Sequence, residues 1–337
     1  AIVSEPEWAF RWLHQHDPRA KFVAVTGTNG KSTTTALISH VTGWPQAGNM
    51  GVPLVNWVGQ TKLPPGWVVE LSSYQLYGCR KFRAHVSVLL NITPDHLPWH
   101  KNMRNYIRSK EAVFANQTRT DVAIGYGGDP QVLKALTQSR AQKKVFYLNE
   151  PFALPKHPHL IGAHNQINLR AAYQACLALG RARTDIIQRM RTFKGIPHRI
   201  ELVKTALASR IFNDSKSTSP ICTAVALDAM ERDVILIVGG LDKGLSLKPI
   251  LQCQGFERVQ HLIAYGQAGP RFARELGDEL ENPPVVVKSF DAAVKQGLLL
   301  LQKTCDLLLS PGCASFDQFK NFEARGKRFV QQVKQWH

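Results

Sequence analysis

The feature that most constrains the fold lies near the start of the chain. An apolar run, Phe22–Thr26, leads into a turn in which Gly27 and Gly30 flank two polar residues. Residues 31–42 then read as a helix that begins with Lys31. A short buried strand followed by a tight turn and a helix is the repeating unit of α/β folds, so the chain is expected to build a mostly parallel sheet.

A turn of this kind is suited to holding phosphate. Its backbone N–H groups converge on an anion, and the start of the helix adds partial positive charge. Lys31 would contact the β- and γ-phosphates, and the Ser32 hydroxyl would ligate Mg²⁺. The general pattern G-x-x-x-x-G-K-[ST] would have glycine where Val25 stands, so the match is imperfect. The turn nevertheless predicts an ATP site, whose contacts are Gly27, Thr28, Asn29, Gly30, Lys31, Ser32 and Thr33.

Composition excludes several classes of protein. With 337 residues, of which 44% are hydrophobic and 20% charged, the chain suits two globular domains. No apolar run approaches the ~18 residues of a membrane span, and acidic residues interrupt the N-terminus where a secretory signal would lie. The six cysteines show no C-x-x-C spacing, which favours the reducing cytoplasm and argues against zinc. The formal charge of +17 is spread along the chain without a dense basic run, so nucleic acid is not expected as a partner.

Strand and helix patterns alternate in two blocks that meet near Gly195 and Pro197, which end a short helix. We expect an ATP-binding domain at residues 1–196 and a Rossmann-like α/β domain at 197–337. Expected elements of the first block are strands Lys21–Thr26, Trp67–Leu71, Val86–Ile92, Asp121–Gly125 and Val145–Leu148, and helices Lys31–Thr42, Asn102–Asn116, Asn165–Leu179 and Asp185–Arg191. Expected strands of the second block are Glu201–Lys204, Ile211–Asn213, Val234–Val238, Val259–Tyr265, Val285–Val287 and Leu307–Leu309. Expected helices of the second block are Pro220–Met230, Gly269–Leu276, Asp291–Gln302 and Phe319–Gln335, and the segments Gly43–Pro53 and Asn149–Pro158 read as loops.

Polar residues follow several of the expected strands. Glu70 ends one strand, where P-loop folds place a carboxylate that binds Mg²⁺. Asp95 and His96 follow another strand, and Lys110 lies on the next helix. Each residue also has a simpler interpretation: Glu70 as a solvent-facing strand end, His96 as a structural histidine, and Lys110 as a surface charge.

Taken in order, the motifs resemble those of the Mur ligases, the ATP-dependent amide-forming enzymes of peptidoglycan precursor synthesis. The motifs of the first half are Thr26–Ser32, Gly48–Gly51, Glu70–Ser73, Asp95-His96, Lys110, His164-Asn165 with Asn168, and His198-Arg199. Three motifs of the second half, Asn213–Thr218, Gly239–Lys243 and Ser310–Phe322, resemble the branch of the family that adds D-glutamate. The resemblance covers essentially the whole chain.

The resemblance implies a defined reaction. The γ-phosphoryl group of ATP would pass to the carboxylate of UDP-N-acetylmuramoyl-L-alanine, and the amine of D-glutamate would attack the acyl phosphate to form an amide. Lys31, Glu70, His96 and Lys110 would be the catalytic residues. By similarity, Ser32 and Glu70 would hold one Mg²⁺, and His96 and Lys110 would hold a second. Lys110 would do so as a carbamate, because an ammonium group repels a metal.

The resemblance also assigns the remaining contacts. Adenine and ribose would be bound by Asn165, Asn168, Arg199 and Asp214, the last two brought onto the nucleotide by closure of the two domains. Substrate contacts would come from Asn49, Ser72, Lys216, Thr218, Lys243, Ser315, Phe316 and Phe322. Cationic and hydroxyl side chains suit the two carboxylates of D-glutamate. Ser315 also has a structural interpretation, as the N-cap of the last helix.

The chain departs from the family in one large respect. Its members begin with a UDP-binding domain of about 100 residues, whereas here only residues 1–20 precede the expected first strand, so this sequence is expected to lack that domain. Smaller departures are Gly312 and the segment Pro98–His100. We expect a monomer that is impaired in turnover when alone and that a separate N-terminal UDP-binding domain would complement. Two alternatives remain: another Mur or folylpolyglutamate-type ligase, and a nucleotide-binding fragment without turnover.

Overall fold

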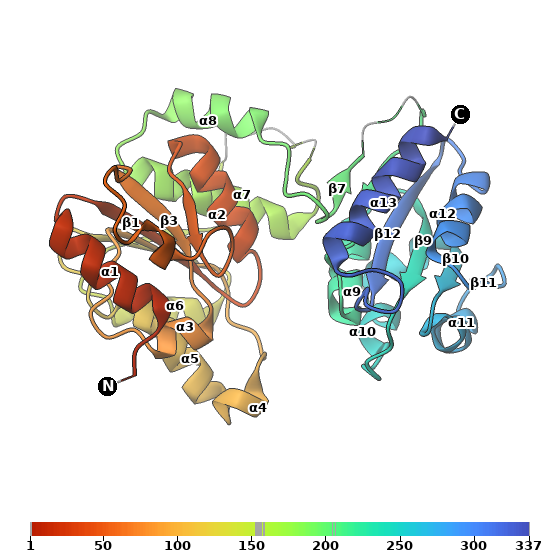
Figure 1. Cartoon of the computed structure of the whole chain (residues 1–337), viewed down its shortest axis with the longest axis horizontal. Coiled ribbons are helices and arrows are strands. Elements are labelled where there is room, and N and C mark those ends of the chain that lie inside the picture. The colour runs from red at the N-terminus through yellow and green to blue at the C-terminus, as the bar shows by residue number, and fades with distance from the viewer. Residues whose placement is uncertain (1, 152–156, 158, 204, 206, 337) are drawn as a thin grey trace. The chain divides into compact units, whose positions relative to one another are not determined.

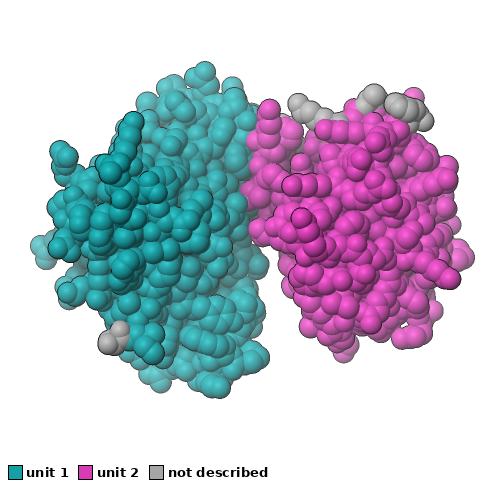
Figure 2. Space-filling model, viewed as in Figure 1, with its two compact units in different colours: residues 1–157, 163–193 teal, residues 158–162, 194–337 magenta. Residues whose placement is uncertain are grey.

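The computed structural model describes residues 2–151, 157, 159–203, 205 and 207–336. The chain divides into two compact units, residues 1–157 with 163–193 (unit 1) and residues 158–162 with 194–337 (unit 2), as Figure 2 shows. Each unit contains a six-stranded sheet flanked by helices (Figure 1). The predicted α/β class with mostly parallel sheets is therefore confirmed.

The sheet of unit 1 is entirely parallel, with strand order β2-β3-β1-β4-β5-β6. Its strands are β1 Lys21–Thr26, β2 Gln46–Gly48, β3 Gly66–Glu70, β4 Val86–Leu89, β5 Val122–Tyr126 and β6 Gln142–Phe146. Its helices are α1 Glu5–His16, α2 Lys31–Thr42, α3 Ser73–Tyr77, α4 Leu97–His100, α5 Met103–Glu111, α6 Pro130–Thr137, α7 Ala163–Ala178 and α8 Arg183–Thr192. The central position of β1 places the turn that follows it at the middle of the sheet edge.

Burial explains why the central strands were the easiest to predict. Every residue of β3, and every residue of β1 after Lys21, is buried, as expected of parallel strands covered on both faces. Phe22 of β1 stacks on Trp67 of β3 with ring centroids 5.1 Å apart, which anchors the core of unit 1. The strands at the sheet edges differ from expectation: β2 lies in a segment expected to be a loop, and β6 begins at Gln142, earlier than predicted. Edge strands need little apolar patterning, because one side of the strand lacks a partner.

The sheet of unit 2 has strand order β11-β10-β9-β12-β8-β7, and only the β7–β8 pair is antiparallel. Its strands are β7 Glu201–Leu202, β8 Ile211–Asn213, β9 Asp233–Gly239, β10 Val259–Tyr265, β11 Val285–Val287 and β12 Cys305–Gly312. Its helices are α9 Pro220–Asp228, α10 Lys248–Leu251, α11 Gly269–Gly277, α12 Phe290–Leu299 and α13 Phe322–Gln335. The chain runs outward from β9 to β11 and returns as β12 on the other side of β9. This reversal creates a switch point at the carboxyl ends of β9 and β12, where ligands bind in open α/β sheets.

Two boundaries in unit 2 correct the expectations. The last helix begins at Phe322 rather than Phe319, because the Asn321 side chain caps it by accepting a hydrogen bond from the Ala324 N–H at 2.8 Å. Ser315 is therefore not the N-cap of this helix. The strand expected at residues 201–204 ends at Leu202, and Lys204 lies outside the described residues. Across the part of the chain that the structure describes, no helix is both long and apolar enough to span a bilayer.

Candidate active site

The turn between β1 and α2 has a backbone that requires glycine. Gly30 is the N-cap of α2 with φ +83°, and a Cβ atom there would collide with the side-chain oxygen of Asn168. Asn168 belongs to α7, is 2% exposed, and accepts a hydrogen bond from the Thr34 hydroxyl at 3.3 Å. No side chain caps the start of α2, so the N–H groups of its first turn remain directed at the turn. This arrangement is an anion-binding helix terminus.

Asn91, two residues after the end of β4, holds the turn in this shape. Its side-chain oxygen accepts a hydrogen bond from the Asn29 N–H at 2.8 Å, and its side-chain nitrogen donates to the Asn29 carbonyl at 3.1 Å. The Asn91 carbonyl also accepts from the Thr28 N–H at 2.9 Å. Sequence reasoning placed Asn91 inside a strand and assigned it no role. Its contacts make the turn pre-organised for a ligand.

Two lysines converge on the turn. The Lys31 ammonium donates to the carbonyls of Gly27 and Thr28, at 3.0 and 2.8 Å, and the Lys110 ammonium donates to the Gly27 carbonyl at 2.7 Å. Lys110 is 1% exposed, so its interpretation as a surface charge is wrong. Burial, followed by the charge of Lys31, lowers the pKa of Lys110 to about 7. The two amino groups repel each other when both are charged, and an anionic ligand at the turn would relieve that repulsion.

Glu70, at the end of β3, has an oxygen without a hydrogen-bond partner. The residue is 2% exposed, so it is not a solvent-facing strand end. Its Oε1 accepts a hydrogen bond from the Asn49 side-chain amide at 2.9 Å, whereas its Oε2 is buried and has no hydrogen-bond partner among the residues that the structure describes. An orphaned buried carboxylate oxygen costs free energy that a cation would recover. With the Ser32 hydroxyl it offers the hard oxygen ligands that Mg²⁺ prefers, so these residues fit that ion.

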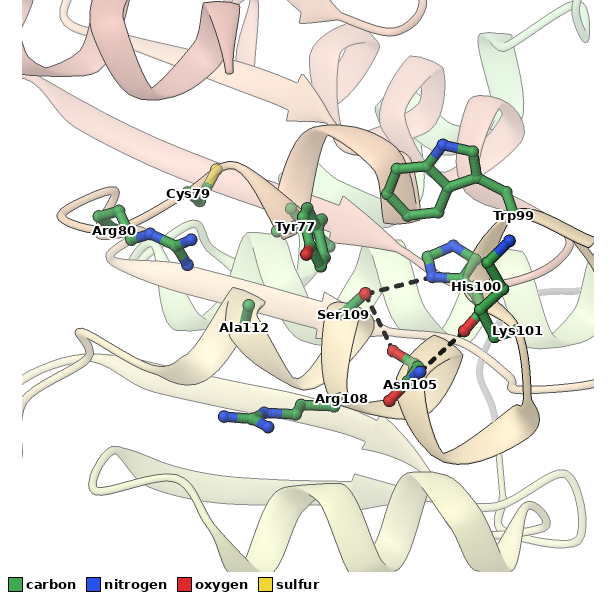
Figure 3. Close-up of a pocket in the computed structure, with 11 residues that line it drawn as sticks. Tyr77, Cys79, Arg80, Trp99, His100, Lys101, Asn105, Arg108, Ser109 and Ala112 are labelled. Atoms are coloured by element: carbon green, nitrogen blue, oxygen red, sulfur yellow. Dashed lines mark hydrogen bonds between the residues drawn. The ribbon is translucent and has the colours of Figure 1, made fainter. Parts of the chain in front are cut away.

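His96 and Lys110, proposed for a second Mg²⁺, both lie close enough to His100 (Figure 3) for their charges to act on it. His96 adopts φ +53° at the start of α4 and its side chain is 46% exposed, with Nε2 3.3 Å from the Asp95 carboxylate. Burial, and then the charges of His96 and Lys110, lower the pKa of His100. Within the described residues, no group of three or more His, Cys, Asp or Glu side chains gathers as a metal cage. An Mg²⁺ bound here would therefore depend on ligand oxygens, as is usual for nucleotide-bound Mg²⁺.

Three further predicted residues of unit 1 already serve local structure. Ser72 is the N-cap of α3 and forms a capping box with Gln75. Asn165, which is 5% exposed, accepts a hydrogen bond from the Asn168 side-chain nitrogen at 3.0 Å. The amide of Asn168 therefore faces both Asn165 and the glycine turn. Asn49 donates a hydrogen bond to Glu70 and so orients its carboxylate. These hydrogen bonds hold the residues of the proposed ATP and Mg²⁺ sites in place.

In unit 2, Asp214 joins three segments. Its carboxylate accepts hydrogen bonds from the Ile200 N–H at 3.1 Å, from the Ser310 hydroxyl at 2.8 Å and from the Ser217 hydroxyl. Burial raises the pKa of Asp214 to about 6, while these hydrogen bonds and the nearby charge of Arg199 act in the opposite direction. Arg199 itself is half-buried. Asp214 thus holds together the ends of β8 and β12 and the segment that contains Arg199.

The predicted substrate residues of unit 2 differ in burial and in their contacts. Lys216 and Phe322 lie together, with the Lys216 ammonium 5.7 Å from the Phe322 ring centroid. Ser315 is buried, and its carbonyl accepts hydrogen bonds from two N–H groups of the turn that follows it. Thr218 is half-buried, and Lys243 and Phe316 are exposed, Phe316 at 67%.

Sequence reasoning missed two charged residues near these loops. Arg325 is fully buried and donates to the Ser215 hydroxyl and carbonyl, the Cys313 carbonyl and the Tyr265 hydroxyl, at 2.8–3.2 Å. It therefore ties the loop after β8 to the loop after β12. Both carboxylate oxygens of Asp317 are buried, and neither has a hydrogen-bond partner within the described ranges. Nothing in the local sequence distinguishes either residue from an ordinary surface charge.

Solved structures resemble this chain in fold. A UDP-N-acetylmuramoylalanyl-D-glutamyl-2,6-diaminopimelate–D-alanyl-D-alanyl ligase from Acinetobacter baumannii matches 97% of the chain and 78% of its own length, with a TM-score of 0.70 and 18% identity. A MurF ligase from Thermotoga maritima in complex with ADP matches 98% of the chain and 82% of its own length, with a TM-score of 0.66 and 16% identity. At these identities the comparison establishes the fold alone.

Sequence comparison establishes the family. Residues 25–157 match the Mur ligase middle domain. A UDP-N-acetylmuramoylalanine–D-glutamate ligase from Bacillus pumilus is 35% identical over 97% of this chain and 77% of its own length. A ligase of the same name from Staphylococcus aureus is 33% identical over 94% of this chain and 74% of its own length. The chain therefore belongs to the Mur ligase family of ATP-dependent ligases.

Proposed function

We propose that this chain joins D-glutamate to UDP-N-acetylmuramoyl-L-alanine at the expense of ATP. The observation that carries the proposal is the buried Glu70 oxygen without a partner, at the end of the strand next to a pre-organised phosphate turn. The names of the two sequence relatives and the three motifs of unit 2 support D-glutamate as the amino acid. We place the enzyme in the cytoplasm, because its six cysteines show no C-x-x-C spacing and so agree with a reducing compartment.

ATP would bind with its β- and γ-phosphates on the turn from Gly27 to Thr33. The N–H groups of the turn and the Lys31 ammonium would contact the phosphate oxygens. Ser32 and Glu70 would hold Mg²⁺, which when bound neutralises the charge that develops on the transferred phosphoryl group. The Thermotoga maritima relative was solved in complex with ADP, which agrees with this assignment. Arg199 and Asp214 of unit 2, together with Asn165 and Asn168, would complete the nucleotide contacts.

The reaction has two balanced steps. The bond between the γ-phosphorus and the bridging oxygen of ATP breaks as a carboxylate oxygen of the acceptor bonds to that phosphorus, which yields ADP and an acyl phosphate. The neutral amine of D-glutamate then attacks the acyl carbon, loses a proton and expels phosphate. Lys31 stabilises the charge shared by two anions in the first step. The cationic and hydroxyl side chains of Lys216, Thr218, Lys243 and Ser315 would bind the carboxylates of D-glutamate, and Phe316 and Phe322 would line its pocket.

Lys110 would act as a carbamate and, with His96, hold the second Mg²⁺ near the acceptor carboxylate. Formation of a carbamate requires the neutral amine, which attacks carbon dioxide and then releases a proton. Burial supports this step, because it lowers the pKa of Lys110 to about 7 and so supplies neutral amine at ordinary pH. Exposure of the protein to ¹³C-labelled carbon dioxide should produce a carbamate carbon signal that is absent from Lys110→Arg.

The test of the proposed function is amide formation with purified protein, ATP, Mg²⁺ and UDP-N-acetylmuramoyl-L-alanine, measured with and without an added UDP-binding domain of a related ligase. We expect phosphate release that requires D-glutamate and is not supported by L-lysine, D-alanine or L-glutamate, with the amide product identified by mass. Glu70→Gln should abolish turnover, whereas Glu279→Gln, at an exposed glutamate, should leave it unchanged. Turnover with a different amino acid, or turnover in Glu70→Gln, would refute the proposal.

A further inference from the structure

The loop that follows β9 (residues 240–247, the Lys243 loop) lies beside the loop that carries Ser315. The Leu241 N–H donates to the Ala314 carbonyl at 2.9 Å, and these two residues form an antiparallel bridge. The bridge joins the carboxyl ends of β9 and β12, which form the switch point of the unit 2 sheet. Two residues proposed to bind D-glutamate, one with an ammonium group and one with a hydroxyl group, therefore start from neighbouring stretches of backbone.

Arg271, on α11, holds the Lys243 loop on both sides of that lysine. Its Nε and Nη2 donate to the two oxygens of the Asp242 carboxylate at 2.7 and 2.8 Å, and its Nη1 donates to the Leu245 carbonyl at 3.2 Å. Asp242 in turn accepts a hydrogen bond from the Gly244 N–H at 2.9 Å. Because a bidentate contact fixes orientation as well as distance, Arg271 fixes the backbone from Asp242 to Leu245.

Arg271 also balances a negative charge that is adjacent to Lys243. The hydrogen bonds from Arg271 lower the pKa of Asp242, so this carboxylate is ionised at neutral pH. Without its partner, the carboxylate would attract the Lys243 ammonium and would repel the carboxylates of an approaching amino acid. In the ion pair its charge is compensated, and only 23% of the Asp242 side chain is exposed.

The Lys243 ammonium, by contrast, is available to a ligand. Lys243 is exposed, and its side chain forms neither a hydrogen bond nor an ion pair with any residue that the structure describes. Its backbone lies between two residues that Arg271 holds. A loop that is fixed before binding loses less conformational freedom when the ligand arrives, so this arrangement favours binding of a carboxylate.

We propose that Arg271 is a positioning residue for the amino-acid substrate. It keeps Asp242 in an ion pair and fixes the Lys243 loop, so that the Lys243 ammonium is presented to a carboxylate of D-glutamate. This inference rests on the proposed function and adds the residue that prepares its amino-acid site. Arg271 contacts neither the substrate nor the reacting atoms, and no covalent step depends on it.

The test replaces Arg271 by methionine and measures turnover in the presence of an added UDP-binding domain of a related ligase. We expect the KM for D-glutamate to rise about tenfold or more, because the unpaired Asp242 carboxylate competes for Lys243 and repels the substrate. The KM for ATP, and kcat at saturating D-glutamate, should stay within about twofold of wild type. The matched control is Arg274→Met on the same helix, where the side chain is 73% exposed and lies 4.0 Å from Glu275; its kinetic constants should match those of wild type.

Two further variants separate positioning from a general structural effect. The double variant Arg271→Met, Asp242→Asn removes the unpaired charge as well, so its KM for D-glutamate should return to within about threefold of wild type. Arg271→Lys should give an intermediate KM, because lysine restores the charge but not the two parallel N–H contacts. An unchanged KM for D-glutamate in Arg271→Met, or a double variant as impaired as Arg271→Met, would overturn the inference.

Amide hydrogen exchange separates a failure of this inference from a failure of the proposed function, because it requires no turnover. Exchange in the Lys243 loop should accelerate in Arg271→Met but not in Arg274→Met. Unchanged exchange in Arg271→Met overturns the inference, even if D-glutamate addition is confirmed. If wild type adds a different amino acid, the proposed function fails, whereas faster exchange together with a raised KM for that amino acid still supports the role of Arg271.

Discussion

Replacement of Lys110 by methionine should change the pH dependence of stability in a predictable direction. Lys110 is 1% exposed, and its pKa falls from the usual 10.5 to about 7, chiefly through burial. Between these two pH values the unfolded chain binds a proton at Lys110 that the folded chain does not bind. The free energy of unfolding of the wild type therefore rises with pH across this window.

The magnitude follows from the displacement of the pKa. At about 1.4 kcal/mol for each pH unit, a fall from 10.5 to about 7 corresponds to about 5 kcal/mol over the whole window. Methionine cannot titrate, so Lys110→Met lacks this dependence. It also loses the hydrogen bond to the Gly27 carbonyl, but that loss is the same at every pH. Between pH 7.5 and 9.5 we expect the wild type to gain about 2–3 kcal/mol relative to Lys110→Met.

Urea unfolding measured at several pH values, in buffer free of carbon dioxide, tests this expectation. Tryptophan fluorescence reports mainly on unit 1, because every tryptophan except Trp336 lies there. Lys134→Met, at an exposed lysine of α6, controls for the general effect of replacing lysine by methionine. Wild-type and Lys110→Met stabilities that stay parallel from pH 7.5 to 9.5 would show that burial does not displace the Lys110 pKa.

Three further substitutions have expected outcomes. Glu7→Gln should destabilise unit 1 by about 2–3 kcal/mol in urea unfolding at pH 7, since the fully buried carboxylate accepts three consecutive backbone N–H groups. Burial raises the pKa of Glu7, but the hydrogen bonds lower it by more, so its pKa is below the usual 4.5. The stability difference between wild type and Glu7→Gln should therefore shrink as the pH falls below 4.5, and a difference unchanged at pH 3 contradicts this. Gly30→Ala should weaken ATP binding about tenfold or more by calorimetry, because φ +83° and the contact with Asn168 exclude a Cβ atom; wild-type affinity would refute it. Arg325→Met should destabilise unit 2 by about 3 kcal/mol by removing donors from buried acceptors. The loss should exceed that of the exposed control Arg232→Met in the same thermal melt, and an equal loss in both would count against it.

Sequence patterns predicted the helices and strands well where neighbouring residues alone specify the element. β1 and α2 have the predicted bounds, because a buried apolar run, a glycine turn and a helical segment are all specified by neighbouring residues. The edge strands β2 and β6 and the helix α1 were misplaced or missed, because their positions depend on pairing and packing with distant segments. The predicted start of α13 was wrong, because the N-cap at Asn321 rather than apolar periodicity sets the N-terminus of that helix.

By itself, the sequence determined the phosphate turn, the α/β class and the family, because each depends on the order and spacing of residue types along the chain. Only the tertiary structure decided the chemical state of the site. The lowered pKa of Lys110 and the orphaned oxygen of Glu70 arise from burial, and burial depends on which distant segments pack against a residue. The hydrogen bonds of Asn91 and Asn168 arise in the same way, from segments that meet only when the sheet and its helices assemble.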